Sequence, residues 1–85
     1  MALTILYFAW VREKIGTGEE TVEVPAHVTT ARVLAGWLAG RSESHRAALS
    51  DLARIRVAVD QVFADLDAPI AGAREIAFFP PVTGG

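Results

Sequence analysis

The chain has 85 residues, 52% of them hydrophobic, so a single domain with a dense apolar core is expected. It has no cysteine, which excludes disulfides, thiolate metal sites and cysteine nucleophiles and favours a cytoplasmic protein. Its net charge of −2 argues against nucleic acid as the main ligand. The apolar N-terminus lacks a basic stretch and reaches Arg12 too early for a signal peptide or a membrane span, so no membrane association is expected.

The first third of the chain is predicted to contain two strands. Residues 2–9 are apolar on both faces, which is typical of a central strand. The following segment, REKIGTGEE, has mixed charge and two glycines and is expected to form a loop or hairpin turn. Residues 21–24 are predicted as a second short strand, because β-branched residues alternate there and Pro25 ends the run.

A helix is predicted next, beginning at Thr29 or Thr30 as its N-cap. Its apolar face is expected to bury the side chains at positions 33, 34, 37 and 38, Trp37 among them. Gly40 is placed to end this helix, and Ser42 can cap a second, shorter helical segment.

The remainder of the chain is predicted to be mostly strand. RIRVAVD alternates, with positions 55, 57 and 59 inward and Arg56 and Ala58 outward. Asp60 and Gln61 can turn the chain into a brief strand at 62–63, and residues 75–79 form the last strand. This order predicts an α+β fold of the β-grasp, ubiquitin-like type, whose mixed sheet packs on one main helix plus a short second helix. Residues 1–80 are expected to form the domain and residues 81–85 an extended tail.

No enzyme site is apparent in the sequence. His27 and His45 lack metal-ligand spacing, so no metal site is expected, and a surface or capping role is favoured for each. Asp65 and Asp67 are interpreted as turn residues beside a proline. No serine has a plausible base partner nearby in the sequence, which leaves a triad assembled in space open.

The C-terminal sequence FFPPVTGG is the most informative segment. If Phe78 faces the helix, then Phe79 faces the open side of the sheet, near Phe8 or Leu6, where it indicates an interface. Pro80 and the proline after it stop the sheet and favour an extended stalk.

The terminal diglycine has no side chains and can pass through a narrow channel, with the carboxylate of Gly85 as the group it delivers. That carboxylate is ionised and a poor electrophile, so it must be activated with ATP as an acyl-adenylate. A sulfur donor would then give a thiocarboxylate, and an amine would give an amide.

Three segments, AFFPPVTGG, YFAWVREKIG and VAVDQ, together resemble the small subunit of molybdopterin synthase, the MoaD family. The resemblance covers nearly the whole chain. The chain departs from the family at Asp60, where Asn is frequent, at AGAREI before the last strand, and at Trp10.

The resemblance implies a non-catalytic sulfur carrier in molybdenum cofactor biosynthesis. An adenylyltransferase of the ubiquitin-activating type uses ATP on Gly85, and a cysteine desulfurase or rhodanese-like protein supplies sulfur for the thiocarboxylate. The loaded tail inserts into the large subunit of a heterotetramer and donates sulfur to the pterin precursor, cyclic pyranopterin monophosphate; no cofactor is bound permanently. Gly84 gives clearance, Val82 and Thr83 line the channel, Phe8, Phe79 and Pro80 dock, and Arg12 adds polar rim contacts.

Three other functions share parts of this pattern. A sulfur carrier for another pathway, such as thiazole synthesis, shares the diglycine but usually not the Phe-Phe-Pro-Pro sequence. A ubiquitin-like protein modifier, joined through Gly85 to lysines, shares the chemistry up to the adenylate. A plain interaction module would use no covalent chemistry, and loss of Gly85 would then be harmless.

Overall fold

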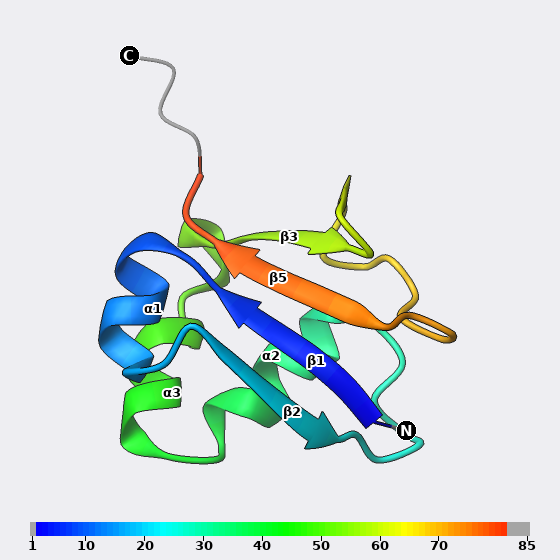
Figure 1. Cartoon of the computed structure of the whole chain (residues 1–85), viewed down its shortest axis with the longest axis horizontal. Coiled ribbons are helices and arrows are strands. Elements are labelled where there is room, and N and C mark those ends of the chain that lie inside the picture. The colour runs from blue at the N-terminus through cyan, green and yellow to red at the C-terminus, as the bar shows by residue number, and fades with distance from the viewer. Residues whose placement is uncertain (1, 82–85) are drawn as a thin grey trace.

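The computed structural model describes residues 2–81 (Figure 1). Five strands and three α-helices follow one another along this part of the chain, with a short 3₁₀ turn, η1, before the third strand. In order they are β1 (Ala2–Tyr7), α1 (Ala9–Ile15), β2 (Glu19–Glu23), α2 (Ala31–Ala39), α3 (Glu43–Leu49), η1 (Leu52–Arg54), β3 (Arg56–Val59), β4 (Val62–Ala64) and β5 (Glu75–Phe79).

The strands form one mixed sheet in the order β2-β1-β5-β3-β4. Of the three inner strands, β1 and β5 run parallel to each other, and all other neighbouring pairs are antiparallel. Helices α2 and α3 lie behind the sheet in Figure 1, so one face of the sheet is covered and the front face carries no helix. This arrangement confirms the predicted α+β class and mixed sheet.

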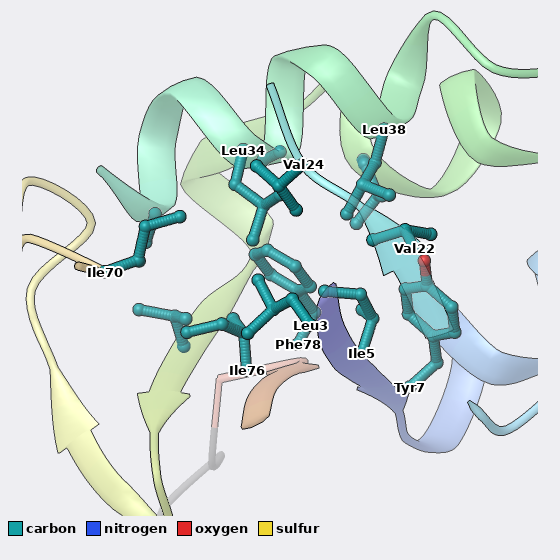
Figure 2. Packing of buried hydrophobic residues seen from close by; sticks show 14 of the residues in the cluster. Leu3, Ile5, Tyr7, Val22, Val24, Leu34, Leu38, Ile70, Ile76 and Phe78 are labelled. Carbon is teal, nitrogen blue, oxygen red and sulfur yellow. The ribbon is translucent and has the colours of Figure 1, made fainter. Parts of the chain in front are cut away.

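The core lies between the sheet and α2 (Figure 2). On β1, Leu3 and Ile5 point toward the helix, and on β5 Ile76 and Phe78 do the same; all four are at most 1% exposed. Because successive strand residues alternate between faces, burying Phe78 places Phe79 on the open face, as the sequence predicted.

The prediction of one main helix plus a short second helix is wrong, because residues 9–15 form a further helix, α1, instead of a loop. Val11 is fully buried and Ile15 packs against the core, so this i, i+4 pair holds α1 against the domain. The charged residues of α1 lie on its other side. Gly16 ends α1 with a φ of 95°, a left-handed conformation that glycine adopts without strain.

Helix α2 begins as predicted, with Thr30 as its N-cap: its hydroxyl accepts a hydrogen bond from the N–H of Val33. The predicted buried face is wrong in part, because Val33 is exposed and Trp37 is only half-buried, with Arg41 over its ring. The buried stripe of α2 follows the i, i+3, i+4, i+7 pattern and includes two alanines. Its members are Ala31, Leu34, Ala35 and Leu38.

Ser42 caps α3 as predicted, since its hydroxyl accepts the N–H of His45. Between residues 2 and 81, no helix has both the length and the apolar character needed to cross a bilayer.

Candidate functional site

The face of the sheet that carries no helix holds an open apolar groove of about 390 Å³. Leu6 of β1, Ala58 of β3 and Ala77 of β5 are adjacent on its floor, where Leu6 and Ala58 each pair with Ala77. Three aromatic rings contributed by different segments, Phe8, Phe63 and Phe79, complete the lining, with Gln61 and Glu75 at the end away from the C-terminus of β5.

Small residues make this groove possible. Ala58 and Ala77 are directly opposed across β3 and β5. Their short side chains leave a hollow between the larger aromatic side chains. Phe63 pairs with Ala58 across the β3–β4 hairpin and its ring lies 5.5 Å from that of Phe79. The floor is therefore flat and methyl-lined, and two contacting rings form one wall.

Much of this apolar surface faces solvent. Phe63 is 78% exposed and Phe8 is 48% exposed, while Phe79 is half-buried. A contiguous exposed apolar surface of this kind is typical of a protein interface. We refer to the groove and its three rings as the docking face.

The backbone around Phe8 directs that side chain onto the docking face. Phe8 is extended, with a φ of −127°, and continues the alternation of β1, so it lies on the same side as Leu6. Ala9 then adopts a φ of 53°, a left-handed conformation that is uncommon for alanine. This sharp turn takes the chain from β1 directly into α1, and the N–H of Phe8 donates to the carbonyl of Phe78 at 3.1 Å.

The opposite end of the groove is fixed by Asp60. Its Oδ1 accepts the backbone N–H groups of Arg74 and Glu75, both at 2.9 Å. Asp60 and Gln61 both have positive φ, so the β3–β4 turn is tight, and these two hydrogen bonds attach it to the start of β5. An asparagine at position 60 would present the same acceptor through its side-chain oxygen.

The structure brings together some of the predicted site residues and separates others. Phe8 and Phe79 line one groove, and Pro80 follows Phe79 directly and is half-buried. Arg12 does not line the groove; its side chain lies along α1 beside Gly18. Val82, Thr83, Gly84 and Gly85 lie outside the described residues.

Phe63 was missed as a docking residue, although the sequence contained its signal. Ala58 was predicted to face outward, and a tight turn at residues 60–61 makes position 63 its cross-strand partner. Cross-strand partners share a face, so Phe63 had to lie on the open side.

Comparison with known proteins identifies the family. The model of the ThiS family matches residues 5–85. The molybdopterin synthase sulfur carrier subunit of Escherichia coli (strain K12) is 40% identical over 83 residues, covering 98% of this chain and 99% of that protein.

Two solved structures share the architecture. SAMP1 from Haloferax volcanii superposes with a TM-score of 0.74 at 26% identity, covering all of both chains. A chain of the complex of subunits 1 and 2 of molybdopterin-converting factor from Helicobacter pylori has a TM-score of 0.63 at 20% identity, again over all of both chains, and shows the shared fold. The chain therefore belongs to the ThiS family and, within it, to the molybdopterin synthase sulfur carrier subunits.

Proposed function

We propose that this chain carries sulfur as a thiocarboxylate on Gly85 and delivers it to the pterin precursor of molybdopterin. The observation that carries the proposal is the docking face, which includes Phe79 at the end of β5; four residues separate Phe79 from the two terminal glycines. A face that binds a partner and a tail without side chains suit delivery of a terminal group into that partner's active site.

Sulfur is loaded onto Gly85 through an acyl-adenylate. A carboxylate oxygen of Gly85 attacks the α-phosphate of ATP and expels pyrophosphate, which leaves an acyl-adenylate. A hydrosulfide sulfur then attacks the acyl carbon and AMP departs with one of the carboxylate oxygens, so that oxygen is replaced by sulfur. Where the donor is a protein persulfide, its terminal sulfur first forms an acyl disulfide, and a thiol cleaves the S–S bond to release the thiocarboxylate and leave a disulfide on the donor. The activating partner is an adenylyltransferase of the ubiquitin-activating type, and the sulfur comes from a cysteine desulfurase or rhodanese-like protein; we place both reactions in the cytoplasm.

We assign the docking face to the large subunit of molybdopterin synthase. Phe8, Phe63 and Phe79 supply rigid apolar anchors of the kind that dominate binding energy at interfaces. The Helicobacter pylori structure is a complex of subunits 1 and 2 of molybdopterin-converting factor, and this supports an equivalent pairing here. We place this pair in a heterotetramer with two large subunits at its centre.

In this assignment the body, residues 1–80, docks, and the tail, residues 81–85, enters the active site of the large subunit. Val82 and Thr83 line the entry channel, where their backbone can add to a strand of the partner, and Gly84 permits close approach because it has no Cβ. Pro80 and Pro81 keep the tail extended. The acid and base groups belong to the large subunit, so this chain donates sulfur without being catalytic itself.

A second candidate function is protein modification through Gly85. A likeness to a protein described as a modifier favours it: the structure of small archaeal modifier protein 1 from Haloferax volcanii has a TM-score of 0.71 at 26% identity. The acyl-adenylate is common to both functions, and the acceptor distinguishes them: sulfur in one, a lysine amine in the other.

A transfer assay tests the proposal. The chain with a chemically prepared Gly85 thiocarboxylate is mixed with the large subunit and the pterin precursor, and dithiolene formation is followed. We expect product with this chain and none when one alanine is appended after Gly85. In the extended chain the carbonyl carbon of Gly85 is part of a peptide bond and cannot carry the sulfur. Product from the extended chain would overturn the delivery mechanism, and absence of product from the loaded chain would overturn the assigned substrate.

A further inference from the structure

A second set of connected side chains lies on the helix-covered side of the sheet, away from the docking face. The hydroxyl of Tyr7 donates to Oε2 of Glu20 at 2.7 Å, and Nε2 of His45 lies 2.7 Å from the same oxygen. Nδ1 of His45 lies 2.7 Å from Oγ of Ser42. A hydroxyl, an imidazole and a carboxylate are thus joined in sequence, which is the arrangement of a nucleophile, a base and the group that orients the base.

The hydrogen bonds define where the protons lie. Partial burial disfavours ionisation of Glu20, but the hydrogen bonds from His45 and Tyr7 and the positive charge of Arg41 together lower the pKa of this carboxyl. An ionised carboxylate only accepts, so the proton between Glu20 and His45 is on Nε2. In the neutral ring, Nδ1 then has a free lone pair directed at the hydroxyl of Ser42 and can take its proton.

The cluster combines a sheltered base with an open nucleophile. The side chains of His45 and Glu20 are only 14% and 20% exposed, and the ring of Tyr7 packs edge-on against the imidazole at 6.2 Å. The guanidinium of Arg41 lies 3.8 Å from the other oxygen of Glu20. These contacts hold the imidazole in one orientation, whereas Ser42, at the start of α3, is exposed to solvent.

Helix capping explains only part of this geometry. Oγ of Ser42 accepts the backbone N–H of His45 at 3.1 Å, which is an ordinary N-cap bond. Capping does not require the imidazole to contact the same hydroxyl, nor its far nitrogen to be held by a carboxylate from β2. The expectation that no serine has a base partner nearby in the sequence is wrong, because His45 lies three residues from Ser42. Only the contact with Glu20, 25 residues from His45, depends on the fold.

We propose that Ser42 is a nucleophile activated by His45, that Glu20 positions the imidazole, and that this site accepts acyl groups from small activated esters. Oγ attacks the ester carbonyl carbon as its proton moves to Nδ1. The tetrahedral adduct then collapses: the bond to the leaving oxygen breaks, and that oxygen takes the proton from Nδ1. The products are an acyl-serine and an alcohol, and the site does not depend on the sulfur-carrier function of the tail.

An alkyl fluorophosphonate tests the site in the full chain. Oγ forms a bond to phosphorus, the phosphorus–fluorine bond breaks, fluoride leaves, and the stable adduct is located by peptide mass spectrometry. Ser44 and Ser50 are exposed serines at either end of the same helical segment and serve as internal controls. General-base assistance contributes ~10²–10⁴-fold, so we expect Ser42 to be labelled at least ~10-fold faster than either control.

Two variants separate activation from exposure. Ser44→Ala should leave labelling of Ser42 unchanged, and His45→Gln should reduce it to the rate of the control serines while circular dichroism shows an intact fold. Equal labelling of Ser42, Ser44 and Ser50 in the unmodified chain would overturn the proposal, whether or not the histidine variant folds. Undiminished labelling in folded His45→Gln would overturn the assignment of the base.

Discussion

Replacing Phe63 by alanine tests the docking face most selectively, because its ring is 78% exposed in the free chain. The fold loses little from its removal, mainly the contact with Phe79 at 5.5 Å, so unfolding free energy should fall by less than about 1 kcal/mol. Binding should lose far more, because docking removes the ring from water.

The magnitude follows from the exposed surface. An aromatic side chain buries about 150–250 Å², so about three quarters of that, ~120–190 Å², is available to a partner. At ~25 cal/mol per Å² this corresponds to ~3–5 kcal/mol, an upper bound because the variant retains Cβ and the interface packs imperfectly. We expect a loss of about 2–3 kcal/mol, or roughly 30- to 150-fold in Kd.

The assay is titration calorimetry with the large subunit, using the full chain and a form that lacks residues 82–85, so that the contribution of the tail is removed. Val62→Ala is the matched control: Val62 is the neighbouring residue on β4, is 67% exposed and does not line the groove. It should change binding by less than about 0.5 kcal/mol. Equal affinities for the Phe63 and Val62 variants would refute the docking face.

Three further predictions concern the scaffold, each checked by chemical or thermal unfolding. Gly16→Ala should destabilise by about 1 kcal/mol because of its φ of 95°, whereas Gly36→Ala in α2 should stabilise by a similar amount; an added Cβ meets nothing within 4 Å at either site. Asp60→Ala should cost about 1–2 kcal/mol through two lost acceptor bonds, and Asp60→Asn much less; equal losses would contradict this role. Glu20 has a lowered pKa, so its stabilising contribution is present above its ordinary pKa and lost as pH falls through the lower folded value. Tyr7 has a raised pKa, from burial and then from Glu20, so its contribution is present below its ordinary pKa of about 10 and is lost as pH rises above it. Glu20→Gln should flatten the acid limb of melting temperature against pH, and an unchanged acid limb would contradict this.

Most of the sheet could be predicted from alternation alone. Residues 75–79 form β5 as expected, and Phe78 and Phe79 face opposite sides because the strand period is two. The same alternation predicts Phe79 on the open face.

Helix α1 could not be predicted so simply, because Trp10, Val11 and Ile15 are its only core-packing residues and the charges between them resemble a solvated loop. Its existence depends on tertiary packing against the core and on the left-handed turn at Ala9, which local propensity disfavours. The exposure of Val33 likewise depends on which side of α2 faces the sheet. The apolar residues of α2 cover more than one side, so the sequence alone does not say which of them are buried.

Sites assembled across the fold were the least predictable. Phe63 follows from strand pairing once the register of β3 and β4 is known. The association of Ser42 and His45 with Glu20 depends on how α3 packs against α1 and α2, and only the i, i+3 spacing of Ser42 and His45 was visible in the sequence.

The central claim is that the carboxylate of Gly85 carries sulfur, and intact mass spectrometry tests it most directly. The chain is incubated with the activating enzyme, ATP and a sulfur-donor protein, with parallel samples that lack ATP or carry an alanine after Gly85. We predict replacement of one oxygen by sulfur at the C-terminus, only in the complete reaction. An unchanged mass in the complete reaction, or capture of the chain as an amide on lysines of other proteins with no thiocarboxylate formed, would contradict the claim.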